Sequence, residues 1–173
     1  MTLTADAQEL HIEAIRLAPS EEIPNSTLPL LLYRGVLNEA AAGSGALADA
    51  FETLFCANDW PGAWRNGIFP FHHYHSRAHE VLGIFEGHAS VRFGGPGGVT
   101  LDVTPGDLVV IPAGVGHKRV AVRGVLGVVG AYPRGQHPDT CRSGEGIENI
   151  ASVMLPACDP VYGKAGPLFT YWT

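Results

Sequence analysis

Apolar residues recur with a helical period in one part of this chain. Between residues 45 and 57 they lie three or four positions apart, at Leu47, Phe51, Leu54 and Phe55. This spacing places the four side chains on one face of an α-helix. The pattern therefore predicts a short helix over about residues 45–57, the one helix that the sequence indicates clearly.

From residue 67 onward the period changes to two. Apolar or alternating segments follow one another, and turn signals such as Gly87 and the pair Arg123-Gly124 separate them. The predicted strands are residues 67–75, 80–86, 89–93, 99–103, 108–111, 116–122 and 125–132. Strands of this length with no helix between them predict an all-β fold, an antiparallel sandwich or jelly-roll β-barrel.

The flanking segments are expected to cover this barrel. Residues 1–20 alternate weakly and predict an arm with a short edge strand, and residues 28–33 predict a further apolar strand. A chain of 173 residues most economically forms one domain. We therefore expect a single domain over 1–173, with the arm and helix at about 1–66, the barrel core at about 67–132 and a Pro- and Gly-rich covering tail at about 133–173.

Charge and hydropathy exclude two classes of partner. The net charge is −6 and no run of Lys or Arg is present, so nucleic acid is not expected to bind. No stretch is apolar enough to cross a bilayer and the first residues do not resemble a secretory signal, so we expect no membrane contact and a cytoplasmic location. The scattered Cys56, Cys141 and Cys158 are expected to be free thiols. The apolar N-terminal strand is compatible with a homodimer.

Four of the eight histidines fall within residues 72–79. His73 and His75 lie two positions apart, so on a strand their side chains share a face. Glu80 begins the next predicted strand, and His117 opens a later one. Three imidazoles and a carboxylate suit one divalent transition metal ion, namely Fe(II), Mn(II), Ni(II), Zn(II) or Cu(II).

The position of the carboxylate ligand has an alternative one residue earlier, at His79. Choosing Glu80 turns the apolar residues Leu82 and Ile84 to the ligand face. Choosing His79 would instead turn the residues on the other face of this strand toward the ligands, because a shift of one residue reverses the face of every side chain on a strand. Glu80 is therefore favoured.

The spacing of these residues resembles the two motifs of the cupin superfamily. The first motif falls on Gly67, His73, His75, Glu80 and Gly87, and the second on Gly106, Pro112, Gly114 and His117. One departure is Ala121, which stands where the second motif usually ends in an asparagine that is not a metal ligand. The phrases LPLLLYRG, WRNGIFPFHHYHSRAHEVLGI, FGGPGG, PAGVGHK and VVGAYPRGQ further resemble the YjlB-like branch of single-domain cupins.

The resemblance implies a jelly-roll barrel whose metal ligands are His73, His75, Glu80 and His117. It implies that the glycines at 67, 87, 106 and 114 serve turns, where a missing Cβ atom permits positive φ. It implies no particular reaction.

Residues beside the ligands are candidates of lower rank. Tyr74, Arg77 and His79 are candidates to orient the ligands, since metal-binding imidazoles usually need a second hydrogen-bond partner. The alternative is that they form a packed or solvated outer face. Arg119 shares a face with His117 and is a candidate to bind an anionic substrate, the alternative being a salt bridge at the barrel end.

Two classes of function fit this site. The first is a metal-dependent enzyme, an oxygenase such as a dioxygenase, an isomerase or a lyase, acting on a small polar metabolite. The second is a non-catalytic module that binds or senses a small molecule. The complete ligand set favours the enzyme.

Overall fold

The computed structural model describes residues 11–38 and 43–173, so part of the predicted arm lies outside the described residues. The strands are β1 (Ile12–Leu17), β2 (Ser26–Tyr33), β3 (Trp64–Asn66), β4 (Glu80–Phe93), β5 (Val99–Val103), β6 (Leu108–Ile111) and β7 (His117–Ala131). The helices are α1 (Gly43–Ala57), α2 (Ile147–Ile150) and α3 (Leu168–Tyr171).

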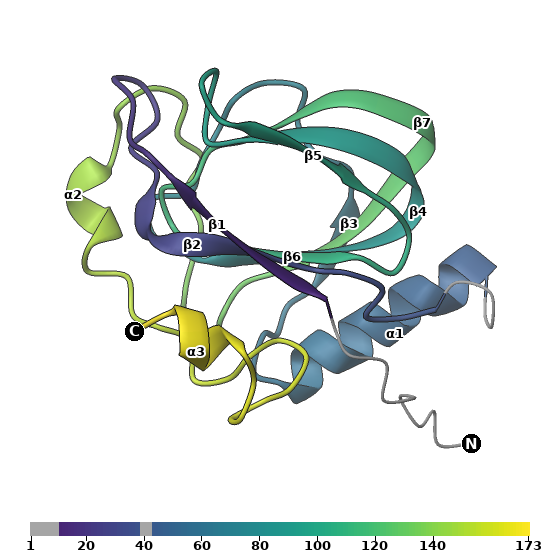
Figure 1. Cartoon of the computed structure of the whole chain (residues 1–173). Helices are drawn as coiled ribbons and strands as arrows, with labels where there is room; N and C mark the ends of the chain where they lie inside the picture. The colour runs from purple at the N-terminus through teal and green to yellow at the C-terminus, as the bar shows by residue number, and fades with distance from the viewer. Residues whose placement is uncertain (1–10, 39–42) are drawn as a thin grey trace.

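All seven strands belong to one antiparallel sheet. Its order is β1-β2-β6-β4-β7-β3, and β5 pairs with β4. The strands surround a central space and α1 lies outside the sheet (Figure 1). No strand pairing within residues 11–38 and 43–173 joins β1 to β3, so the sheet curls without hydrogen-bonded closure. The prediction of an all-β jelly roll is confirmed.

In two places, a pair of neighbouring predicted strands forms one long strand in the structure. Residues 80–93 form β4 and residues 117–131 form β7, so the expected turns at Gly87 and Arg123-Gly124 are wrong. Both glycines do adopt positive φ, at 73° and 78°, where the register between β4 and β7 shifts. Such bulges bend a strand instead of reversing it. The bend lets β4 pair with β6 at one end and with β5 at the other.

The strand predicted over 67–75 is wrong in its extent. This segment makes only isolated bridges, one of them between His73 and His117, and the regular strand β3 ends just before it. Pro70 has no N–H group to donate, which interrupts a hydrogen-bonded ladder at this point. The segment is therefore an extended loop that lies along the start of β7.

Helix α1 packs on the outer face of the sheet. It buries Leu47, Phe51 and Phe55 as predicted, whereas Leu54 is only half-buried. Gly83 of β4 lies under the helix, where an added Cβ atom would come within 2.6 Å of the Phe51 ring. Because the helix covers the outer face of β4, the inner face remains available for the site.

The tail packs against β2 and contains α2 and α3, so the expectation of a single helix is wrong. Asp159 is fully buried and accepts a hydrogen bond from the Tyr33 hydroxyl at 2.7 Å and from three backbone N–H groups of the tail. Trp172 donates its indole N–H to the carbonyl of Pro29 at 2.8 Å. These one-turn helices are stabilised by such distant contacts and leave no periodic signal in the sequence.

Two expectations from composition concern the whole chain. In the part of the chain that the structure describes, no helix has the length and apolar character needed to span a membrane. The three cysteines are free thiols, as predicted.

Candidate metal centre

Backbone hydrogen bonds bring together two segments that carry histidines. His73 and His117 form an antiparallel bridge, in which each donates its backbone N–H to the carbonyl of the other at 3.3 and 2.9 Å. His75 lies two residues further along the same loop, and Glu80 begins β4 opposite Ile111 of β6. The four predicted ligands thus come from β4, from β7 and from the loop before β4.

The side chains of these four residues converge in the barrel interior. One ring nitrogen from each of His73, His75 and His117 lies within 4.8 Å of the others, so the three histidines form a cluster able to bind a metal ion. Glu80 Oε2 lies 3.2 Å from Nε2 of His75 and 3.2 Å from Nε2 of His117. Adjacent ligands that are each about 2.1 Å from an ion lie about 3 Å apart, so these distances fit neighbouring ligands.

Each imidazole is oriented by a backbone carbonyl on its other nitrogen. Nδ1 of His73 lies 3.0 Å from the carbonyl of Phe71, Nδ1 of His75 lies 2.5 Å from that of Asp139, and Nδ1 of His117 lies 3.1 Å from that of Val115. A carbonyl can only accept, so Nδ1 carries the proton in all three rings. In the neutral form each Nε2 therefore presents a lone pair, which is the arrangement that a metal ion requires.

The electrostatics of the cluster require a cation at its centre. Burial, reinforced by the neighbouring His117, lowers the pKa of His73 to about 3, so its ring is neutral. Burial opposes the charge on Glu80 and on His75, but their mutual attraction prevails. It holds the pKa of Glu80 well below its usual range and raises the pKa of His75 to about 9. A proton or a metal ion must therefore lie between the carboxylate and the imidazoles.

A cavity of about 440 Å³ opens beside the cluster. Its walls are largely apolar and are formed by Trp64, Ile68, Phe69, Pro70, Leu82 and Pro138. Besides the four clustered residues, its polar side chains are Asn66, Arg119, Tyr132 and Thr140. The volume lies at the lower end of the range of about 300–1,000 Å³ for ligand pockets, so the cavity suits a small molecule.

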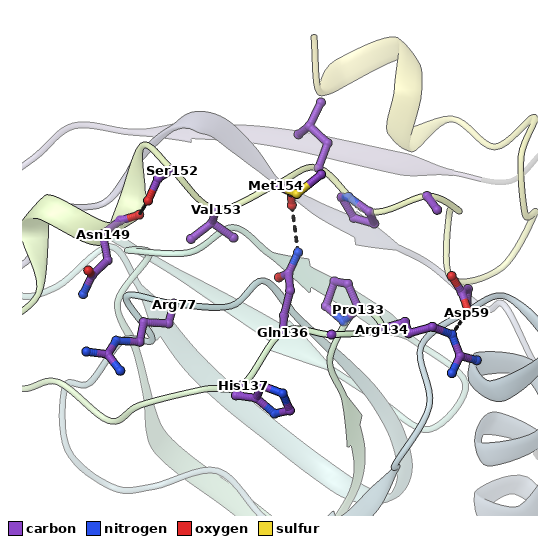
Figure 2. A pocket seen from close by; sticks show the side chains of 14 residues that line it. Asp59, Arg77, Pro133, Arg134, Gln136, His137, Asn149, Ser152, Val153 and Met154 are labelled. Atoms are coloured by element: carbon purple, nitrogen blue, oxygen red, sulfur yellow. Dashed lines mark hydrogen bonds and ion pairs between the residues drawn. The ribbon is translucent and has the colours of Figure 1, made fainter.

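A second hollow, of about 670 Å³, lies outside the barrel and is larger (Figure 2). Several of its polar groups bind one another. Gln136 donates to the carbonyl of Met154 at 2.8 Å, Ser152 donates to the carbonyl of Asn149 at 2.7 Å, and an arginine–aspartate ion pair lies at one end (Figure 2). None of the four clustered residues lines it. The groove is formed mostly by segments of the tail within residues 133–157, and no residue of the seven strands lines it.

The lower-ranked candidates lie in different places. Arg119 lines the cavity. Tyr74 is buried on the opposite side and donates its hydroxyl to the carbonyl of Glu145 at 2.6 Å. Arg77 is exposed and lines the outer groove (Figure 2).

His79 is buried away from the cavity. Its Nδ1 accepts the backbone N–H of Ala113 at 2.9 Å, and its ring packs on Trp172 with centroids 4.8 Å apart. Burial lowers the pKa of His79 to about 4, so the ring is neutral. Of the two residues weighed for the carboxylate position, Glu80 is the one that lines the cavity.

Sequence reasoning missed two residues of the site. Tyr132 lines the cavity and accepts the indole N–H of Trp64 at 3.1 Å, while burial and the nearby Glu80 raise its pKa. Asp139 supplies the carbonyl that orients His75, and its carboxylate accepts from the backbone N–H and the hydroxyl of Ser76 at 2.7 and 2.5 Å. Tyr132 ends the predicted strand 125–132 and shares a face with Val128 of the interior core, whereas the position of Asp139 in the tail depends on distant contacts and not on a period.

A family model and a related protein both match this chain. A sequence model of the family described as "Cupin" matches residues 64–132. The chain is also 37% identical over 157 residues to the Bacillus subtilis protein named "Uncharacterized protein YjlB", covering 87% of this chain and 90% of that protein.

Several solved structures are more distantly similar. Acireductone dioxygenase from Bacillus anthracis, with a cadmium ion in its active centre, is 14% identical with a TM-score of 0.39, covering 61% of this chain and 72% of that one. The DMSP lyase DddQ from Ruegeria pomeroyi is 15% identical with a TM-score of 0.34, covering 77% and 51%. Vicilin from Capsicum annuum is 17% identical with a TM-score of 0.39, covering 73% and 34%. Similarity at this level assigns no activity to this chain.

The contacts of Asp139 generate a test of how His75 is held. Asp139→Ala keeps the backbone carbonyl but releases Ser76, so the loop that carries this carbonyl should lose its fixed position. We expect the affinity for Zn(II) to fall about tenfold, as when an outer partner of a metal ligand is removed. Competition with a chromophoric chelator measures the affinity.

The matched control for this variant is Asp102→Ala. Asp102 also accepts a serine hydroxyl, that of Ser90 at 2.5 Å, but it lies on β5 and does not line the cavity. Equal zinc affinities for the Asp139 and Asp102 variants would contradict the positioning role.

Proposed function

Given that this chain belongs to the cupin superfamily and to its YjlB-like branch, we propose that it is a metal-dependent enzyme. Its metal ligands are His73, His75, Glu80 and His117. The observation that carries the proposal is the convergence of three Nδ1-protonated imidazoles and one carboxylate beside a small cavity.

The donor set fits a catalytic ion better than a structural one. Structural metal sites are usually closed and rich in thiolates, whereas these donors are nitrogen and oxygen atoms that line a cavity. Imidazole and carboxylate suit Fe(II), Mn(II), Ni(II), Zn(II) or Cu(II). When bound, such an ion supplies a Lewis acid or a redox centre to a molecule in the cavity.

The remaining groups define what the chain itself contributes. The apolar walls, among them Trp64, Ile68 and Leu82, border the space beside the donors. The cavity takes a small molecule, and its four polar side chains other than the donors can orient that molecule. These features support an oxygenase, an isomerase or a lyase that acts on a small polar metabolite.

Metal content is the first test of this proposal. We expect the native protein, supplied with Zn(II) or Fe(II), to bind about one ion per chain and to melt at a lower temperature once a chelator removes it. An ion that binds only the native state stabilises it by about 2.7 kcal/mol when its free concentration is a hundred times the dissociation constant. Elemental analysis and thermal melts measure both effects, and a stoichiometry near zero would contradict the site.

Turnover is the second test. Protein purified without added metal is analysed for its elements, then loaded with Fe(II) under anaerobic conditions and screened with small polar metabolites. Oxygen uptake and product formation are followed together, so that an isomerase or lyase is detected as well as an oxygenase. Conversion that depends on both metal and metabolite is the expected result. Tight binding of metal and metabolite with no conversion would favour the binding or sensing module instead.

A further inference from the structure

One cation in the cavity has no counter-ion among the residues that the structure describes. Arg119 follows His117 by two residues on β7 and lines the same cavity. It pairs with Val91 of β4, whose side chain belongs to the interior core, so both residues face the barrel interior. The backbone N–H of Arg119 donates to the carbonyl of Phe69 at 2.9 Å, which fixes the strand at this point.

The side chain of Arg119 is unusual among the arginines of the described chain. Three others bind carboxylates of the protein: Arg34, Arg65 and Arg134. Within the described residues the guanidinium of Arg119 makes no hydrogen bond or ion pair, although the residue is half-buried. Among the described residues Arg77 and Arg123 also lack a side-chain partner, but both are exposed. A partly desolvated guanidinium is costly unless an anion pairs with it.

The charge balance of the cavity indicates an anion as well. With three neutral imidazoles, a divalent ion and the Glu80 carboxylate together leave about one positive charge, and Arg119 adds a second. The described residues that line the cavity contain no other carboxylate. A ligand that carries negative charge is needed to balance the site.

We propose that Arg119 is a substrate-binding residue and that the substrate of this cavity is a small carboxylate. The inference rests on the proposed function and names its substrate class. The planar fork of a guanidinium matches a carboxylate with two parallel hydrogen bonds. The carbon skeleton of the acid lies against the apolar walls, which include Ile68, Phe69 and Leu82.

A phosphate is the less suitable anion for this cavity. Phosphate sites usually gather several backbone N–H groups, as at the N-terminus of a helix, or more than one cation. Arg119 is the single arginine of the described lining, no lysine lines the cavity, and no residue of α1, α2 or α3 does so. Largely apolar walls also fit an organic acid better than a fully hydrated phosphate.

Binding of organic acids to the zinc-loaded protein tests this inference. Pyruvate, succinate and benzoate are titrated by calorimetry at constant ionic strength, with benzamide as the neutral match of benzoate and inorganic phosphate as the competing anion. We expect the wild type to bind at least one of the acids and to bind benzamide or phosphate more weakly than that acid. Arg119→Met should lower the affinity for the acid by at least about tenfold, which is the effect of losing a charge-assisted hydrogen bond. The acid affinity of Arg119→Lys should lie between those of the wild type and Arg119→Met, since lysine keeps the charge but lacks the planar fork of the guanidinium.

Arg123→Met is the matched control, because Arg123 is an exposed arginine on the same strand. It should bind acid like the wild type. Equal affinities of the wild type and Arg119→Met, an equal loss in Arg123→Met, or tighter binding of phosphate would each overturn the inference. So would the failure of all three acids to bind the zinc-loaded wild type.

Zinc content and thermal melts are measured first on every sample. A wild type that holds no zinc contradicts the proposed function itself. A wild type that holds zinc, but whose acid affinity does not depend on Arg119, contradicts only the assignment of the substrate.

Discussion

Lone pairs that face one another inside the barrel are the constraint on which the site depends. The carbonyls of Phe71, Asp139 and Val115 hold the Nδ1 protons of three imidazoles, and Nε2 of His75 and Nε2 of His117 each lie 3.2 Å from the Glu80 carboxylate. Acceptors at 3.2 Å repel each other unless a cation lies between them. Burial intensifies the repulsion, because a buried environment screens charges less than bulk water does. The arrangement is stable with a proton or a metal ion at its centre, and the geometry of the donors favours the metal.

The rest of the fold keeps these donors fixed while leaving space beside them. The bulges at Gly87 and Gly124 bend β4 and β7, which lets both strands continue around the barrel. Helix α1 and the tail contact the outer face of the sheet, where a second core of buried residues forms outside the barrel. The tail also reaches the site, since Asp139 belongs to it and orients His75. The same segment separates the cavity from the outer groove, where Gln136 and Met154 bind each other.

Local patterns predicted the elements of the site better than its surroundings. The alternation of side chains on a strand is a local property, so the shared face of His73 and His75 could be predicted directly. The position of His117 depends on how β7 pairs with a distant loop, and only the spacing of the second cupin motif indicated it. Positive φ was predicted at Gly87, but whether such a glycine reverses or bends the chain depends on the partner strand. Asp139 was beyond prediction, because its position follows from long-range contacts of an aperiodic segment. Tyr132 ends the predicted strand 125–132, so the alternation of that strand was a signal for its face.

The central claim is that Glu80, and not its neighbour His79, completes the metal site. The most direct measurement is the metal content of Glu80→Gln and His79→Gln after dialysis with limiting chelator, with circular dichroism to confirm that both variants are folded. Glutamine removes the charge of Glu80 with little change in volume. We predict that Glu80→Gln loses the ion and that His79→Gln keeps it, since His79 lies against Trp172 and outside the cavity. Loss of metal in the His79 variant with retention in the Glu80 variant would contradict the account.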